Sequence, residues 1–176
     1  HQEYPYVGFA LPDSLQVRDI AMLREAGIIC IRTAHYPPDE VFMNACDELG
    51  ILCVIPTPGW QIYPSSLLFD ERSYENTRRI IRWNRNHSAA LMWEPVLNET
   101  DYPAYFAENQ LQIVREECGD APAFAACDSC ARGAEYFPVN YRYGETESEK
   151  PLFIREYGDA YMEQYRPMGT LRRVRR

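Results

Sequence analysis

Short apolar segments alternate with longer amphipathic segments along most of the chain. The short segments are expected to be β-strands, and they lie at residues 28–33, 51–55, 89–93, 123–126, 138–141 and 152–154. The longer segments carry apolar residues at helical spacing, and they lie at residues 15–25, 39–49, 72–85 and 103–117. Strands that alternate with helices indicate βαβ units and a parallel sheet. An open doubly wound sheet and a partial (β/α)8 barrel both fit this number of strands.

The first of these helices carries signals for its start and for its buried side. Asp13 and Ser14 precede it, and both are residue types that cap helix N-termini. Val17, Ile20 and Leu23 recur at helical spacing along one side. We therefore expect a capped helix that packs these three side chains against the sheet.

Composition and charge exclude several classes of function. The 176 residues correspond to one domain at about 150 residues per domain. Lys and Arg number 18 against 26 Asp and Glu, which gives a net charge of −8. An acidic chain is poorly suited to the phosphates of nucleic acids, and no apolar run approaches the roughly 20 residues of a membrane span. We expect neither a nucleic-acid partner nor a membrane partner.

Six cysteines raise the question of disulfides and metals. The chain is too long and too apolar to need disulfides, and its cysteines favour a reducing compartment. Cys127 and Cys130 form a single CxxC pair, and neither a second pair nor a nearby pair of histidines completes a zinc site. We expect no metal and no cofactor, and both the cytoplasm and the periplasm remain open as locations.

Two glutamates follow predicted strands at positions where a barrel would place functional groups. In (β/α)8 barrels these groups lie at the C-terminal ends of the strands. Glu99 comes shortly after the strand predicted at 89–93, and Glu156 comes directly after the one at 152–154. Paired carboxylates are the groups that hydrolyse glycosides, because one protonates the leaving oxygen and the other attacks the sugar or activates water. On spacing alone, the alternative is that both glutamates merely line loops.

The stretches around these glutamates resemble glycoside hydrolase family 2. The matching stretches are WEPVLNET at 93–100, IREYGD at 154–159, the segment 31–54 and, more weakly, residues 1–8. The resemblance implies the catalytic (β/α)8 barrel of that family, particularly its β-galactosidase-like members. It makes the six predicted strands the second to seventh of the barrel. Residues 1–176 are then expected to be a partial barrel truncated at both ends, lacking the first strand and the last β/α unit.

The resemblance also implies a role for individual residues. Glu99 matches the general acid/base, Glu156 matches the nucleophile, and Asn98 matches the asparagine that contacts the sugar hydroxyl next to the anomeric carbon. Further matches imply substrate-binding roles for Arg32, His35, His1 and Tyr141.

Some of these residues keep alternative interpretations. Arg32 fits a structural salt bridge inside the barrel as well as a substrate contact. Without the resemblance of the segment 31–54 to the family, His35 would be interpreted as a buried structural histidine. Trp60 lies in a Pro-rich loop, where it is either a platform that stacks on a sugar or a plug of the barrel top.

The expected activity is that of a retaining exo-β-glycosidase acting on β-galactosides. The alternatives are a β-glucuronidase or β-mannosidase of the same family, or a sugar-binding barrel without turnover. The implied partners are a carbohydrate substrate, the missing barrel strands and accessory β-sandwich domains. Some family members bind magnesium near the active site, but the loop at 55–60 offers no ligands for it. Glu94 and Pro95 depart from the family pattern and leave the substrate preference open.

Overall fold

The structure is a computed structural model that describes residues 4, 6–98, 100–119, 126–128 and 137–139. The elements, in chain order, are α1 (Asp13–Glu25), β1 (Cys30–Arg32), α2 (Glu40–Leu49), β2 (Leu52–Pro56), α3 (Leu67–Asn84), β3 (Ala90–Glu94), α4 (Ala104–Cys118), β4 (Ala126–Asp128) and β5 (Phe137–Val139).

The strands form two sheets, and within each sheet neighbouring strands pair in parallel and in chain order. β1, β2 and β3 form a sheet in that order, with Cys30 opposite Leu52 and Cys53 opposite Ala90. β4 and β5 pair in parallel as well, and β4 lies next to β3. A doubly wound sheet reverses its strand order at a switch point, whereas a barrel does not. The described strands are therefore consistent with part of a barrel wall.

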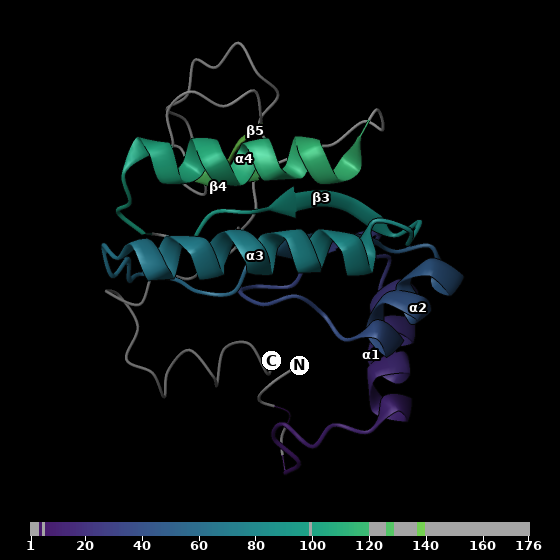
Figure 1. Cartoon of the computed structure of the whole chain (residues 1–176). Helices are drawn as coiled ribbons and strands as arrows, with labels where there is room; N and C mark the ends of the chain where they lie inside the picture. The colour runs from purple at the N-terminus through teal and green to yellow at the C-terminus, as the bar shows by residue number, and fades with distance from the viewer. Residues whose placement is uncertain (1–3, 5, 99, 120–125, 129–136, 140–176) are drawn as a thin grey trace, which may run out of the picture.

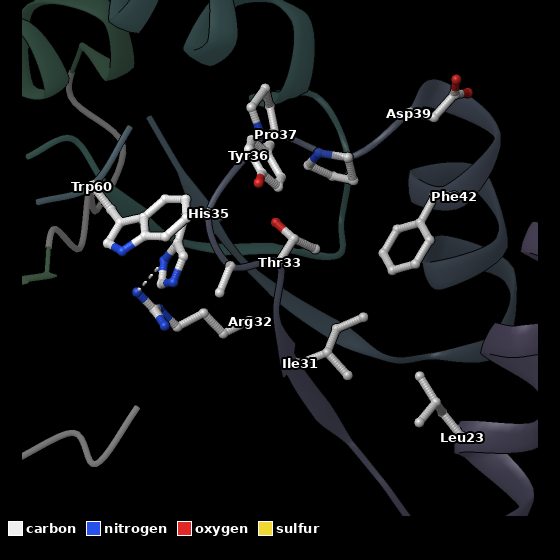
Figure 2. Close-up of a pocket in the computed structure, with 12 residues that line it drawn as sticks. Leu23, Ile31, Arg32, Thr33, His35, Tyr36, Pro37, Asp39, Phe42 and Trp60 are labelled. Carbon is white, nitrogen blue, oxygen red and sulfur yellow. Dashed lines mark hydrogen bonds between the residues drawn. The ribbon is translucent and has the colours of Figure 1, made fainter. Parts of the chain in front are cut away.

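The helices cover the strands in two pairs (Figure 1). α3 and α4 lie side by side along β3, and α1 and α2 pack together at the other end of the sheet. Each described helix sends fully buried side chains into a common apolar core, as Ile20, Met43, Ile81 and Val114 do, and Ile55 of the central strand meets them. Beside β1, the side chains of α1 and α2 also border a cavity (Figure 2).

The start and the buried side of α1 differ from the sequence prediction. Pro12 is the N-cap residue, and Asp13 lies inside the first turn without a capping hydrogen bond from its side chain. Val17 is 42% exposed, whereas Gln16 is buried beside Ile20. Ile20 and Leu23 pack against the core as predicted, and the error is confined to Val17, whose place on the inner side is taken by Gln16. A hydrophobic pattern could not predict this because it assigns glutamine to the solvent side.

α3 begins at Leu67 rather than at residue 72. Its first turn exposes Leu67 and Leu68 and buries Asp70, which is the reverse of the usual pattern. The Asp70 carboxylate accepts hydrogen bonds from the hydroxyls of Tyr63, at 2.9 Å, and Tyr105, at 3.1 Å. These bonds compensate the cost of burying the carboxylate, so a polar residue anchors the turn where apolar residues would be expected.

The remaining boundaries follow the sequence more closely. Asp39 caps α2 by accepting a hydrogen bond from the Val41 N–H, and Gly50 ends the helix with φ +69°. β4 and β5 overlap the strands predicted at 123–126 and 138–141. The strand predicted at 152–154 lies outside the described residues.

The described cysteines behave as small buried or half-buried side chains. Cys30, Cys46, Cys53 and Cys118 are free thiols. Burial raises the pKa of the Cys46 thiol to about 11, so this thiol is unreactive near neutral pH. Cys127 lies in β4, whereas Cys130 lies outside the described residues. Within the described ranges, no three potential metal ligands come together, and no helix is long and apolar enough to cross a membrane.

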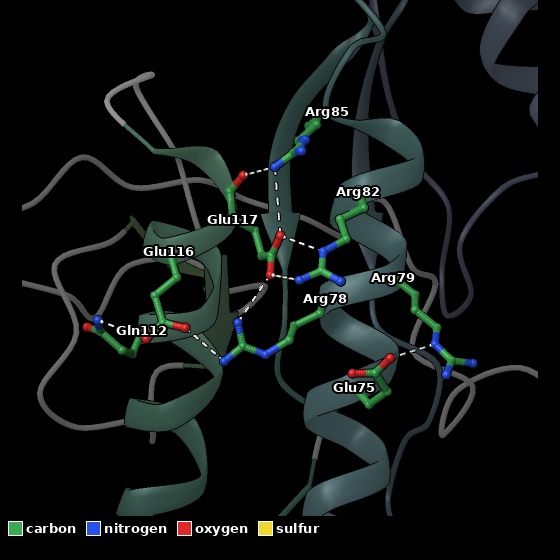
Figure 3. A network of polar contacts seen from close by, with 8 residues as sticks. All are labelled: Glu75, Arg78, Arg79, Arg82, Arg85, Gln112, Glu116 and Glu117. Atoms are coloured by element: carbon green, nitrogen blue, oxygen red, sulfur yellow. Dashed lines mark hydrogen bonds and ion pairs between the residues drawn. The ribbon is translucent and has the colours of Figure 1, made fainter.

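An ion-pair network joins α3 to α4 (Figure 3). Glu117 is largely buried and accepts hydrogen bonds from Arg82, at 2.7 and 2.8 Å, and from Arg78, at 3.2 Å. Arg78 also donates to Glu116 at 2.8 Å. The hydrogen bonds from Arg82, aided by Arg78, hold the pKa of Glu117 below its usual value despite its burial. The charged form of Glu117 therefore stabilises the packing of the two helices.

Glu117→Gln is expected to lower the Tm of the protein by a few degrees at pH 7. A lowered folded-state pKa contributes stability above the ordinary glutamate pKa of about 4.3, and this contribution is lost as the pH falls through the folded-state pKa. The Tm difference between wild type and variant should therefore shrink below about pH 4. Thermal unfolding of both proteins across pH 3–7 measures this difference, and Glu108→Gln, on the exposed side of α4 and outside the network, is the control. A Tm difference that does not depend on pH would contradict the claim that the charge of Glu117 stabilises the packing of α3 and α4.

Candidate active site

The candidate site lies where the parallel strands β1 and β3 end. Arg32 is the last residue of β1, and Glu94 is the last residue of β3. The loop after β2 carries Trp60, and the loop after β3 carries Asn98. Because parallel strands bring their C-terminal ends to one edge, these four side chains gather there from three consecutive strand–loop units.

A buried ion pair spans the central strand of the sheet. Arg32 Nε donates to Glu94 Oε2 at 2.6 Å, and Arg32 Nη2 donates to Glu94 Oε1 at 2.9 Å. The two side chains are only 6% and 2% exposed. Two parallel hydrogen bonds between a planar guanidinium and a carboxylate fix the orientation of both groups. Arg32 thus has the structural ion pair that was one of its two interpretations.

Asn98 extends this pair into a chain of hydrogen bonds. Arg32 Nη2 also donates to Asn98 Oδ1 at 3.1 Å. The Asn98 carbonyl accepts from the Gln61 N–H at 3.1 Å and from the Thr100 hydroxyl at 2.7 Å. Trp60 and Asn98 form a β-bridge. Main-chain bonds therefore tie the loop after β2 to the loop after β3, and they hold the buried Asn98 in place.

The close passage of these two loops depends on a glycine. Gly59 has φ +123°, a conformation that other residues rarely adopt. A Cβ atom there would lie 3.0 Å from Leu97 Cδ2. Gly59 therefore allows the loop to turn directly beside the segment that carries Asn98.

His35 and Trp60 form the open side of the site (Figure 2). Their rings stack with centroids 5.7 Å apart and an angle of 30° between the planes. His35 Nδ1 lies 3.4 Å from Arg32 Nη2. Trp60 is 45% exposed, so one part of its ring is accessible to a ligand. An aromatic ring held in this way offers a flat surface for the apolar face of a sugar.

A cavity of about 590 Å³ opens beside these side chains. Arg32, His35 and Trp60 line its polar end, whereas Ile31 and Phe42 are among the residues of its apolar end. The volume lies within the range of small-molecule sites. Among the described lining residues, Arg32 is the only arginine or lysine, and its charge is balanced by Glu94.

The structure brings together four of the eight residues that the sequence singled out. Arg32, His35, Trp60 and Asn98 are in direct contact or joined by the bonds given above. The other four lie outside the described residues: His1, Glu99, Tyr141 and Glu156. Sequence reasoning missed Glu94 as a member of the site. The sequence does place a carboxylate at the end of an apolar strand, and a carboxylate buried there needs a cation as its partner. This pattern could have identified Glu94.

Comparison with known proteins assigns the chain to a family. Residues 1–117 match the model of the TIM barrel domain of glycosyl hydrolases family 2. This match covers more than half of the chain, and the chain therefore belongs to that family. The resemblance of the stretches around Asn98 and Arg32 is thereby confirmed, and the three-stranded parallel sheet with its four helices fits a domain of this class.

Relatives of two activities are similar to the chain. A β-galactosidase of Thermoanaerobacterium thermosulfurigenes is 37% identical over 117 residues, which cover 66% of this chain and 16% of that protein. A β-glucuronidase of Sus scrofa is 32% identical over 111 residues, which cover 61% of this chain and 16% of that protein. The chain therefore spans about one sixth of the length of each relative.

Solved structures show the same architecture. A family 2 β-galacturonidase from Eisenbergiella tayi, bound to galacturonate, superposes with a TM-score of 0.62 at 28% identity. The superposition covers 72% of this chain and 24% of that one. The described strands and helices thus have the arrangement of a segment of a known family 2 enzyme.

Proposed function

We propose that the chain supplies the core of the active site of a retaining exo-β-glycosidase that acts on β-galactosides. The observation that carries the proposal is the convergence of Arg32, His35, Trp60 and Asn98 at the strand ends of a family 2 barrel domain. A charged hydrogen-bonding group, an amide and an exposed ring are the groups that bind and orient a sugar.

The proposed mechanism is a double displacement by two glutamates. Glu156 attacks the anomeric carbon, while Glu99 protonates the leaving oxygen. A covalent glycosyl-enzyme forms, and Glu99 then removes a proton from the water that hydrolyses it. Glu99 follows Asn98 directly in the chain. In this proposal Asn98 contacts the hydroxyl next to the reacting carbon, and it is held in place by Arg32 and by two hydrogen bonds to its main-chain carbonyl.

Two observations favour a neutral sugar such as galactose over a uronic acid. The β-galactosidase relative named above is more similar to the chain than the β-glucuronidase. A uronate carboxylate is best recognised by a cation with unspent charge. Among the described residues of the cavity, the one guanidinium is neutralised by Glu94. β-Glucuronides and β-mannosides remain the alternative substrates within the family.

A panel of chromogenic glycosides tests the proposed activity on the full-length protein that carries this chain. We expect the β-galactoside to have the highest kcat/KM, ahead of the β-glucuronide and the β-mannoside. A highest value for the glucuronide would overturn the assigned sugar. Binding of galactose without hydrolysis of any member of the panel would instead support the alternative of a sugar-binding barrel without turnover.

We also propose that residues 1–176 act as one part of a larger catalytic unit, completed by further barrel strands and accompanied by accessory β-sandwich domains. β1 is an edge strand among the described residues, and Ile29 beside it is 63% exposed. Unpaired edges and exposed apolar side chains favour association with another chain or strand.

Residues 1–176 expressed alone are therefore expected to associate and to lack glycosidase activity. Size-exclusion chromatography and a glycosidase assay, run beside the full-length protein, check both points. A monomeric product with the activity of the full-length protein would contradict the need for further strands.

A further inference from the structure

Glu94 is a buried carboxylate in the site, and it is neither the acid/base nor the nucleophile of the proposed mechanism. It ends β3, is 1% exposed and makes two hydrogen bonds with Arg32. Its main-chain carbonyl accepts a hydrogen bond from the Thr57 N–H at 2.9 Å, so its backbone is fixed as well. Burying a carboxylate costs free energy, and here the ion pair with the Arg32 guanidinium offsets that cost.

We propose that Glu94 is a positioning residue that sets the orientation of the Asn98 amide by holding the Arg32 guanidinium in place. Arg32 Nη2 serves both partners, since it donates to Glu94 Oε1 and to Asn98 Oδ1. The bidentate contact with Glu94 fixes the plane of the guanidinium. That plane determines where Nη2 directs its second hydrogen.

The chemistry of arginine then decides which end of the amide faces it. A guanidinium has five N–H donors and no acceptor. Asn98 must therefore turn its oxygen, and not its nitrogen, toward Arg32, in agreement with the 3.1 Å contact to Oδ1. This leaves the Nδ2 group of Asn98 to donate a hydrogen bond to an oxygen of the ligand. Glu94 thus acts on the substrate through Arg32 and Asn98 without touching it.

This inference rests on the proposed function, in which Asn98 contacts the sugar hydroxyl next to the anomeric carbon. The informative quantity is the preference of the enzyme for a β-galactoside over its 2-deoxy analogue, expressed as the ratio of their kcat/KM values. Glu94→Gln removes the charge and presents an amide nitrogen to the guanidinium, so one of the two hydrogen bonds becomes a contact between two donors. We expect the ratio to fall about tenfold, which is the effect of losing one well-placed hydrogen bond.

Glu94→Asp provides a second measurement on the same residue. It keeps the charge but shortens the side chain by one methylene, so it should retain more of the preference than Glu94→Gln does. In an Asn98→Ala background, Glu94→Gln should cause no further fall of the ratio. The effects of two substitutions are not additive when both residues act through the same series of hydrogen bonds. A merely structural carboxylate would lower the activity on both substrates alike.

Glu117→Gln is the matched control. Glu117 is also largely buried and paired with arginines, but it lies at the C-terminal end of α4 and contacts α3 (Figure 3). Its substitution should lower stability and leave the ratio unchanged. Suppose that the wild type is active. If both Glu94 variants then keep the wild-type ratio, or if Glu117→Gln lowers the ratio as much as they do, the positioning role of Glu94 is overturned while the proposed function stands. A wild-type protein that hydrolyses neither glycoside would overturn the proposed function, and this inference with it.

Discussion

Substituting Glu156 by glutamine is expected to lower kcat on β-galactosides by at least about a thousandfold in the full-length protein. Glutamine has nearly the size of glutamate but cannot form the covalent ester with the anomeric carbon. Because the loss concerns the chemical step, substrates with good and with poor leaving groups should both be affected. No other substitution in the chain is expected to have a larger effect.

The measurement is a steady-state assay of the purified variant, with circular dichroism to show that it is folded. Glu108→Gln is the control, because Glu108 lies on the exposed side of α4 and the same chemical change there should leave kcat intact. Near-normal turnover of the Glu156 variant would mean that another group is the nucleophile.

The second large effect is expected from Glu99→Ala, and it should depend on the leaving group. A general acid contributes about 10²–10⁴-fold when the leaving oxygen needs a proton. Activated aryl glycosides leave as stable phenolates and need little protonation. The variant should therefore lose two or more orders of magnitude on an alkyl galactoside or a disaccharide, and far less on a nitrophenyl galactoside.

The comparison of kcat/KM across a series of aryl galactosides with leaving groups of different pKa measures this dependence. The variant should show a steeper dependence on leaving-group pKa than the wild type. Equal losses across the series would show that Glu99 is not the acid, and they would point to a structural role for it next to Asn98.

The fold of the described residues could be predicted largely from the pattern of apolar positions. α2 forms as expected because Met43 belongs to a segment with clear helical periodicity, and β2 forms as expected because Ile55 belongs to a short run of consecutive apolar residues. The errors fall where polar groups are buried. Gln16 replaces Val17 on the inner side of α1, and the buried Asp70 brings the start of α3 forward. A pattern of apolar positions assigns such residues to solvent.

The candidate site was predictable only where local motifs carry it. Arg32, His35 and Asn98 stand in stretches that resemble the family, and the structure joins them. The partner of Arg32 is Glu94, which is 62 residues away in the chain. Their contact results from the placement of β1 and β3 on either side of β2, and no periodicity along the sequence encodes it. The same holds for the stacking of Trp60 on His35.

The roles of the two glutamates remain the central proposal, and covalent trapping tests it most directly. A 2-deoxy-2-fluoro β-galactoside with a good leaving group slows hydrolysis of the glycosyl-enzyme, so that the intermediate accumulates. The full-length protein should lose activity with time and gain one fluorosugar per active site by mass spectrometry, and the labelled peptide should carry the sugar on Glu156. Labelling of a different carboxylate, or an active enzyme that is never labelled, would contradict the account.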